Sequence, residues 1–508
     1  MRPRHDTQVV PYNIIKYCKI TNPIIKREGA DEMATIKNVI FDGHNDKDND
    51  KKIKDNVLRT KINFNKEVGK IKPMHASGLG PRQAISGTWD ISHYFKAMNI
   101  PYSRLHDVEY PFGSGEFVDI HCIFPDFDAD ENDPNSYRFE ATDKYLKAMI
   151  DVGCEPFYRL GESIDHGTRK NFIHPPKDFN KWARICEHII RHYNEGWADG
   201  FHFGITYWEI WNEPDGVNKI LGNEQKMWMG TNEEYLELYR ITANHLKNCF
   251  GDTIKVGGPA VCNLNYLVSD NPSPFWTELF KFVGQFLDYV SAEETKAPLD
   301  FFSFHKYFND PKELREYVVA IRKWLDEKGV SKDVEMILNE WNIGVVPNHH
   351  ELYTSKYAAD LAYVFLSCQK SPVDMLMYYY FSRVSNFNRV IGPDMEVFSR
   401  YFSFEMFGKL YKLGTEVDSG EYDPDTNIAV CAATNHKRGG VMVANITDDI
   451  KNLHFDFEGA ENFSEYSVYL MDMAKSPTLP VVVKTGKAEE GLDIVLNGRE
   501  SIMYIDFE

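Results

Sequence analysis

Short apolar runs alternate with amphipathic segments from about residue 70 to residue 410. Eight of these runs have the length and composition of buried strands: 71–78, 102–108, 155–163, 207–214, 254–260, 300–307, 335–342 and 374–381. Helix-like segments with apolar residues three and four apart lie between them, as at 179–196, 232–250 and 312–329. Strands that alternate with helices in this way form a parallel sheet.

Eight strand–helix units are the number that closes a (β/α)8 TIM barrel, in which functional side chains lie at the carboxyl ends of the strands. An open, nucleotide-binding sheet would carry a glycine-rich phosphate turn after its first strand. Here that turn reads HASGLGPR, and no third glycine opens a helix. We therefore predict an α/β fold built on a TIM barrel.

The pattern changes after residue 412 to short alternating runs separated by turn residues, which is typical of antiparallel β structure. A similar pattern occupies the segment before the barrel. We predict an N-terminal tail or extension at 1–32, strands at 33–70 that join a β-sandwich, the barrel at 71–412, and the C-terminal β-sandwich at 413–508.

Composition and net charge limit the classes of molecule that the chain is expected to bind. The formal net charge of −19 disfavours nucleic acid and anionic membranes, since both require clustered Lys and Arg. The eight cysteines include no C-x-x-C pair, so we expect buried thiols.

No signal-peptide-like or 18-residue apolar run occurs, which favours a cytoplasmic protein as the chain is written, or a periplasmic or secreted one if a leader has been removed. Homo-oligomerisation stays open.

Two polar patterns raise the question of metal ions. His188 and His192 stand four residues apart in a helical segment, but no H-E-x-x-H motif accompanies them, so we expect surface histidines. The acidic run at 126–133 lacks the glycine and the distal glutamate of a calcium loop, so we expect a solvated loop. We predict neither a metal nor a cofactor.

The chemistry is predicted at the ends of the fourth and seventh strands. The fourth runs into Trp-Asn-Glu-Pro with Glu213, and the seventh into Asn-Glu-Trp-Asn with Glu340. A carboxylate at the end of a buried strand is costly unless it is paired or used. Two of them on one barrel rim suit glycosidic bond cleavage, in which one carboxylic acid protonates the leaving oxygen and the other carboxylate attacks the anomeric carbon. A separation of roughly 5 Å gives retention of configuration.

WEIWNEPD and ILNEWN, together with RLHD and DFFSFHKY, resemble glycoside hydrolase family 39, the family of β-xylosidases and α-L-iduronidases. The resemblance implies a retaining barrel enzyme with Glu213 as acid/base and Glu340 as nucleophile. It also implies a set of substrate-binding residues around them: Asn212, His305, Tyr307, His106, Arg104 and Trp341. The resemblance implies that Tyr307 and Arg104 hold the nucleophile, while Asn212, His305 and His106 contact the sugar.

The segments after strands seven and eight depart from the xylosidase-like pattern. They read Ile-Gly-Val-Val and Phe-Ser-Arg-Val, without the tyrosine and acidic pair that grip the sugar in xylosidase-like members. We expect an exo-acting enzyme on a β-xyloside-like carbohydrate, with an arabinosidase, a galactosidase or a uronidase as alternatives. An endo-glycanase and a non-catalytic carbohydrate-binding barrel also remain open.

Overall fold

The computed structural model describes residues 57–81, 90–108, 117–165, 167–215, 227–262, 264–344, 351–381, 390–392, 395–447, 449–473, 475–496 and 500–508. The predicted tail at 1–32 and most of the predicted segment at 33–70 lie outside these residues. No helix within the described ranges is long and apolar enough to cross a membrane.

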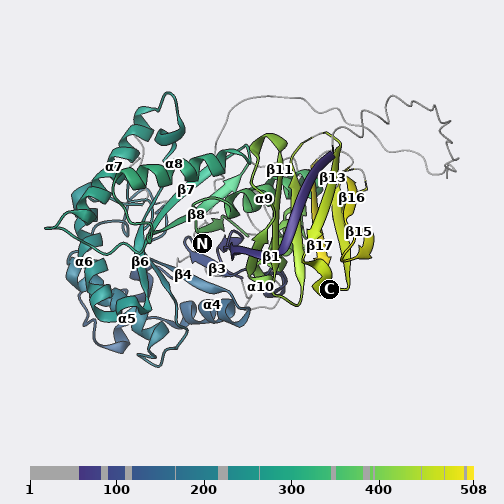
Figure 1. The fold of residues 1–508 in the computed structure, drawn as a ribbon. Coiled ribbons are helices and arrows are strands. Elements are labelled where there is room, and N and C mark those ends of the chain that lie inside the picture. The colour runs from purple at the N-terminus through teal and green to yellow at the C-terminus, as the bar shows by residue number, and fades with distance from the viewer. Residues whose placement is uncertain are drawn as a thin grey trace, which may run out of the picture. The chain divides into compact units, whose positions relative to one another are not determined.

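Eight parallel strands close into the predicted barrel (Figure 1). In chain order they are β2 (Ala76–Gly78), β3 (Tyr102–Leu105), β4 (Glu155–Leu160), β5 (Tyr207–Ile210), β6 (Lys255–Val261), β7 (Phe301–Phe308), β8 (Glu335–Ile343) and β9 (Met375–Tyr378). Each strand pairs with its neighbours in the sequence, and β2 pairs with β9. All eight strands expected from the sequence are therefore present in the barrel.

Helices connect the strands and cover the barrel. They are α2 (Ser92–Met98), α3 (Ile120–Ile123), α4 (Glu140–Asp151), α5 (Phe179–Asn194), α6 (Asn232–Phe250), α7 (Pro274–Ser291), α8 (Glu313–Glu327), α9 (Ser355–Gln369) and α10 (Ser399–Leu413). Capping residues in the sequence explain where several of these helices begin. The side chain of Asp178 accepts backbone N–H groups at the start of α5, and Thr231 forms a capping box with Glu234 at the start of α6.

A second, nine-stranded sheet contains β1 (Val57–Lys70), β10 (Thr415–Asp418), β11 (Ile428–Thr434), β12 (Gly439–Asn445), β13 (Lys451–Glu458), β14 (Glu465–Asp472), β15 (Ser476–Lys487), β16 (Leu492–Leu496) and β17 (Ser501–Phe507). Its order is β15-β14-β17-β12-β11-β10-β1-β13-β16. Strand β1, purple in Figure 1, pairs antiparallel with β10 and parallel with β13. All other pairings in this sheet are antiparallel.

The nine-stranded sheet folds over onto itself around its own apolar core. Phe457 on β13 packs against Phe507 on β17, although four strands separate β13 and β17 in the sheet order. Helices α9 and α10 pack against the other side of this sheet. Helix α9 is buried almost all round, because it contacts the sheet while its Phe365 packs against Trp341 of the barrel.

Candidate active site

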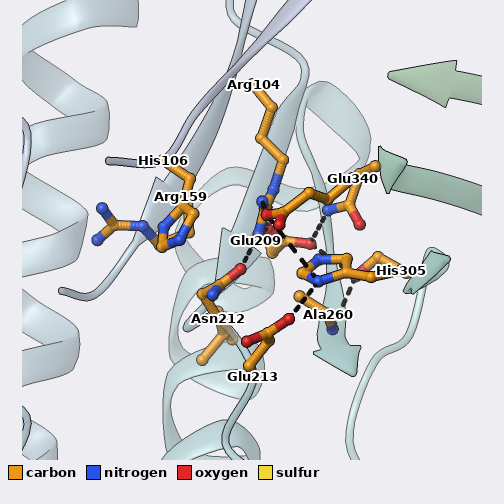
Figure 2. A network of polar contacts seen from close by, with 12 residues as sticks. Arg104, His106, Arg159, Glu209, Asn212, Glu213, Ala260, His305 and Glu340 are labelled. Carbon is orange, nitrogen blue, oxygen red and sulfur yellow. Dashed lines mark hydrogen bonds and ion pairs between the residues drawn. The ribbon is translucent and has the colours of Figure 1, made fainter. Parts of the chain in front are cut away.

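The two predicted glutamates meet at the carboxyl ends of the barrel strands. Glu213 lies three residues after the end of β5, and Glu340 lies within β8. A carboxylate oxygen of each lies within 4.8 Å of the other. His305 on β7 stands between them, with its Nδ1 atom 2.8 Å from Glu213 Oε1 and 3.9 Å from Glu340 Oε2 (Figure 2).

Both oxygens of Glu340 accept hydrogen bonds. The Tyr307 hydroxyl donates to Oε1 at 2.7 Å, and Arg104 Nη1 donates to Oε2 at 3.2 Å. The Glu340 residue is 8% exposed, so the donors and the strand fix its orientation. A carboxylate that is oriented by two donors is prepared for attack on an electrophile.

Arg104 connects Glu340 to Glu209, a second carboxylate deeper in the barrel. Its Nε donates to Glu209 Oε2 at 2.7 Å, and its Nη2 donates to Asn212 Oδ1 at 2.5 Å. The other oxygen of Glu209 accepts from the Ser303 hydroxyl at 2.6 Å and from Asn339 Nδ2 at 2.5 Å. Glu209 is fully buried, and these donors compensate for the loss of water around its charge.

The backbone around Glu213 adopts left-handed conformations, which non-glycine residues rarely do. The φ angles are 72° at Trp211 and 45° at Glu213. Backbone bonds hold this segment: Glu213 N–H donates to the Ala260 carbonyl at 3.0 Å, and Ala260 N–H donates to the Ser303 hydroxyl oxygen at 3.0 Å. Such strain persists only where the surroundings fix it, and it is concentrated at functional sites.

Burial gives Glu213 the protonation behaviour of an acid. It raises the pKa of Glu213 to about 7, against an opposing effect of the Arg104 charge. Burial lowers the pKa of His305 to about 4, so the ring is neutral at pH 7. Nε2 of that ring has no hydrogen-bond partner among the described residues, which favours the tautomer with its proton on Nδ1. Nδ1–H then donates to Oε1 of Glu213 and leaves Oε2 to carry the acidic proton.

Comparison with known proteins identifies the family. The profile of glycosyl hydrolases family 39 matches residues 58–445, more than half of the chain. The chain belongs to glycosyl hydrolase family 39. It is therefore a glycosidase.

The chain is also similar to individual proteins. A β-xylosidase of Caldicellulosiruptor saccharolyticus is 22% identical over 461 residues, which cover 82% of this chain and 85% of the relative. A glucosidase from Croceicoccus marinus is similar in structure, with a TM-score of 0.69, 20% identity, and coverage of 89% of this chain and 99% of the other. A monomeric β-xylosidase from Caulobacter crescentus has a TM-score of 0.62, 15% identity, and the same coverage of 89% and 99%.

The structure of this family 39 member brings most of the predicted site residues together. Glu213, Glu340, His305, Tyr307 and Arg104 form one connected group, and Asn212 joins it through Arg104. His106 lies beside the group and is 3% exposed, so it forms part of the wall rather than an open surface. Figure 2 shows it next to Arg159, on the neighbouring strand.

Trp341 does not offer a face to a substrate in the structure. It is 0% exposed and packs against Phe308, Phe365 and Tyr378. The reason is the alternation of side chains along β8: Glu340 points into the barrel, and the next residue points to the helices outside. The interpretation of Trp341 as a substrate-binding residue is therefore corrected to one of packing.

The two helical histidines are also corrected, because they are buried rather than at the surface. His188 is 9% exposed and His192 is 2% exposed. The ring of His188 bonds the Arg184 carbonyl oxygen, and the ring of His192 bonds the Trp197 carbonyl oxygen and Asp143. Both histidine rings therefore lie within the helical layer and form hydrogen bonds there.

Glu209 and Ser303 are contributors that the sequence did not assign. The available signal was a polar residue inside an apolar strand, as in Tyr-Trp-Glu-Ile on β5. Such a residue needs buried partners, but the sequence does not show which ones.

Three clusters of described residues have side chains spaced for a metal ion: Glu213, His305 and Glu340; Asp119, His121 and Glu162; and Glu187, His245 and Cys249. In the first, the guanidinium of Arg104 contacts Glu340 and opposes a cation. In the second, both Asp119 oxygens already accept hydrogen bonds. In the third, Arg191 and His245 already bind Glu187.

Proposed function

We propose that this chain is a retaining, exo-acting glycosidase in which Glu213 is the acid/base and Glu340 is the nucleophile. The observation that carries the proposal is the approach of the two carboxylates to within 4.8 Å. Retaining enzymes place their two carboxyl groups roughly 5–5.5 Å apart, whereas inverting enzymes leave roughly 6.5–9.5 Å for a water molecule.

In the first step, a Glu340 oxygen attacks the anomeric carbon as the bond to the leaving oxygen breaks. Glu213 transfers its proton from Oε2 to that oxygen, so the leaving group departs as an alcohol. A pKa of about 7 suits this role, because Glu213 is protonated in a large fraction of molecules near neutral pH. Tyr307 and Arg104 hold Glu340 during the attack.

In the second step, the ionised Glu213 takes a proton from a water molecule, which attacks the same carbon and releases the sugar from Glu340. Each step inverts the configuration, so the product retains that of the substrate. Asn212 lies next to the acid, and its Nδ2 donor has no partner within the described part of the chain. We assign this donor to the sugar hydroxyl beside the anomeric carbon.

A β-xyloside-like substrate follows from the relatives rather than from the geometry. The curated relatives from Caldicellulosiruptor saccharolyticus and Geobacillus stearothermophilus are both β-xylosidases, and the latter is 28% identical over 208 residues. The segment at 382–389, where specificity groups were expected, lies outside the described residues. Nitrophenyl β-xyloside is therefore the first substrate to try.

The test is hydrolysis of nitrophenyl α- and β-glycosides by the wild type, Glu213→Ala and Glu340→Ala. Both variants should lose turnover: by at least about 10⁴-fold for Glu340→Ala, and by about 10²–10⁴-fold for Glu213→Ala. Azide should rescue both variants, giving a glycosyl azide of inverted configuration with Glu340→Ala and of retained configuration with Glu213→Ala.

The control is Glu195→Ala, an exposed carboxylate directly after the C-terminal end of α5, whose side chain pairs with Arg191 and with no other residue that the structure describes. It should keep wild-type turnover. If Glu340→Ala kept near wild-type turnover on an accepted substrate, the assignment of the nucleophile would be wrong.

A further inference from the structure

Glu209 is a buried carboxylate that is bonded toward both glutamates of the candidate active site. It lies on β5 and is 0% exposed, so it does not contact a substrate itself. Figure 2 shows it within the polar network. Arg104, Glu209 and Ser303 come from the alternate strands β3, β5 and β7, and side chains from alternate strands fill a TIM barrel in layers. Bulky apolar residues usually form such layers, so packing does not explain these three polar side chains.

One oxygen of Glu209 fixes the direction in which Arg104 points. Its Oε2 accepts a hydrogen bond from Nε of Arg104 at 2.7 Å and lies 2.7 Å from Nη2. A guanidinium group is planar and rigid, so holding two of its nitrogens fixes the position of the third. That third nitrogen, Nη1, donates to Oε2 of Glu340 at 3.2 Å. Glu209 therefore orients Glu340 through Arg104.

The other oxygen of Glu209 is connected to the backbone of Glu213. Its Oε1 accepts the Ser303 hydroxyl at 2.6 Å, and the oxygen of that hydroxyl accepts the Ala260 N–H at 3.0 Å. The Ala260 carbonyl accepts the Glu213 N–H at 3.0 Å. Ala260 and Glu213 both have left-handed backbone, with φ angles of 53° and 45°. The bonds that begin at Oε1 thus hold a backbone conformation that non-glycine residues rarely adopt.

Stability alone does not explain a charged pair at this depth. Taking Arg104 and Glu209 out of water costs free energy, and apolar side chains in place of a buried ion pair are often neutral or stabilising. An apolar pair would fill the same volume, but it would give neither a direction to the donor of Glu340 nor an acceptor to Ser303.

We infer that Glu209 is a positioning residue that aligns the two glutamates of the reaction, Glu340 through Oε2 and Glu213 through Oε1. The inference rests on the proposed function, because it assumes that Glu213 and Glu340 carry out the reaction. A single buried carboxylate then holds both reacting groups in place relative to each other.

The first test is Glu209→Gln, measured as kcat/KM on a dinitrophenyl glycoside. The amide keeps the shape of the side chain but presents N–H groups where the carboxylate accepts hydrogen bonds, so Glu340 should lose its alignment. We expect kcat/KM to fall about 100-fold. Active sites are titrated with a 2-deoxy-2-fluoro glycoside, so that unfolded molecules do not contribute to the loss.

Ser303→Ala tests the connection to Glu213 separately. A dinitrophenolate leaves without a proton, whereas a phenolate needs one from the acid. Misplacing Glu213 should therefore lower kcat/KM at least about tenfold more on the phenyl glycoside than on the dinitrophenyl glycoside. Glu209→Gln should lower kcat/KM on both, because Glu340 attacks in either case.

The pH profile distinguishes the charge of Glu209 from its shape. The Arg104 charge lowers the pKa of Glu213, and the negative charge of Glu209 opposes it. Glu209→Gln should therefore lower that pKa further and move the basic limb of kcat/KM to lower pH. Glu209→Asp keeps the charge but is shorter, so kcat/KM should fall while the limb stays at the wild-type pH.

The matched control is Glu335→Gln, at the amino end of β8. Glu335 also bonds a cation and a hydroxyl, since one oxygen pairs with Lys255 and the other accepts the Tyr207 hydroxyl at 3.0 Å. It lies at the opposite end of the barrel strands from Glu340. Glu335→Gln should leave kcat/KM on both glycosides and the basic limb at their wild-type values, even if the protein becomes less stable.

The outcomes separate the two proposals. A wild type that hydrolyses no glycoside would end the proposed function. With an active wild type, a Glu209→Gln variant that loses stability but keeps kcat/KM per active site and the basic limb would overturn the positioning role alone. Equal losses on the two glycosides in Ser303→Ala would overturn the connection to Glu213. If Glu209→Gln does not fold, wild-type kcat/KM in Glu209→Asp would overturn the role of Glu209.

Discussion

Two arginines on neighbouring barrel strands are buried alike and bonded differently. Arg104 on β3 is 1% exposed, and Arg159 on β4 is 0% exposed. Each nitrogen of the Arg104 guanidinium has an acceptor, provided by Glu209, Glu340 and Asn212. Arg159 donates through Nη2 alone, to Asp119 and Ser163, and its Nε and Nη1 have no hydrogen-bond partner within the described residues.

The difference shows that the same type of side chain has two different roles at the rim formed by the carboxyl ends of the barrel strands. Arg104 on β3 links Glu340 on β8 to Asn212 in the segment after β5, so it joins the two sides of the site. Arg159 links its own strand to Asp119, which precedes α3, and to Ser163, which follows β4. We interpret Arg104 as part of the chemistry and Arg159 as a residue that positions the surrounding loops.

The largest effect is expected for Arg104→Met. It removes the guanidinium from two buried carboxylates, Glu209 and Glu340, and leaves Glu209 with only neutral donors, which should lower the free energy of unfolding by about 3–5 kcal/mol. Activity should also fall, because Glu340 loses one of its two donors. Urea denaturation and kcat/KM on the best nitrophenyl glycoside measure both effects. An Arg104→Met variant with wild-type stability would mean that the pair with Glu209 does not matter.

Arg159→Met should have a smaller effect. Asp119 keeps the Ser163 N–H group at 2.7 Å and the Ser163 hydroxyl at 3.0 Å, so its charge retains two donors. We expect a loss of about 1–3 kcal/mol in the free energy of unfolding. Activity should remain within a few-fold of the wild type. A loss of activity equal to that of Arg104→Met would contradict the different roles assigned to the two arginines.

The pH profile of activity should also distinguish the two arginines. Glu213 must be protonated to act as the acid, so kcat/KM should fall about tenfold per pH unit as pH rises through about 7. The Arg104 charge lowers the pKa of Glu213, so Arg104→Met should move this basic limb to higher pH. Arg159→Met should leave it near 7. A limb that moves equally in both variants would contradict the distinction.

The smallest effect is expected for Ser163→Ala. It removes one hydroxyl donor from Asp119, while Arg159 and the Ser163 N–H group remain. The free energy of unfolding should fall by about 1 kcal/mol, measured by the same denaturation. The pH profile should be unchanged. A larger loss than in Arg159→Met would mean that the hydroxyl, rather than the guanidinium, holds Asp119.

The barrel could be predicted because its strands are continuous apolar runs between amphipathic helices, and such runs are evident in a single sequence. The positions at which the strands end could not be predicted in this way. The fourth strand was expected to continue to residue 214, but β5 ends at Ile210. Left-handed backbone at Trp211 and Glu213 takes the chain out of the ladder. That conformation depends on bonds to Ala260, which is distant in sequence.

The proximity of Glu213 and Glu340 could be predicted from motifs, but the residues that bond to them depend on contacts between strands. The role of Glu209 is evident only from the structure, in which Arg104 and Ser303 lie beside it and donate hydrogen bonds to it. The two histidines on α5 illustrate the same limit. Without an H-E-x-x-H motif they were expected at the surface, but Asp143 and the Trp197 carbonyl bond to His192 inside the helical layer. Local sequence does not report partners from other segments.

Trapping the glycosyl-enzyme intermediate tests the assignment of Glu340 as the nucleophile. A 2-deoxy-2-fluoro glycoside with a dinitrophenolate leaving group slows the second step and lets the covalent intermediate accumulate. After proteolysis, mass spectrometry should find the fluoro sugar on the peptide that carries Glu340, with one equivalent bound per chain. A label on a peptide that carries Glu213 or Glu209 instead, or inactivation without any label, would show that Glu340 is not the nucleophile.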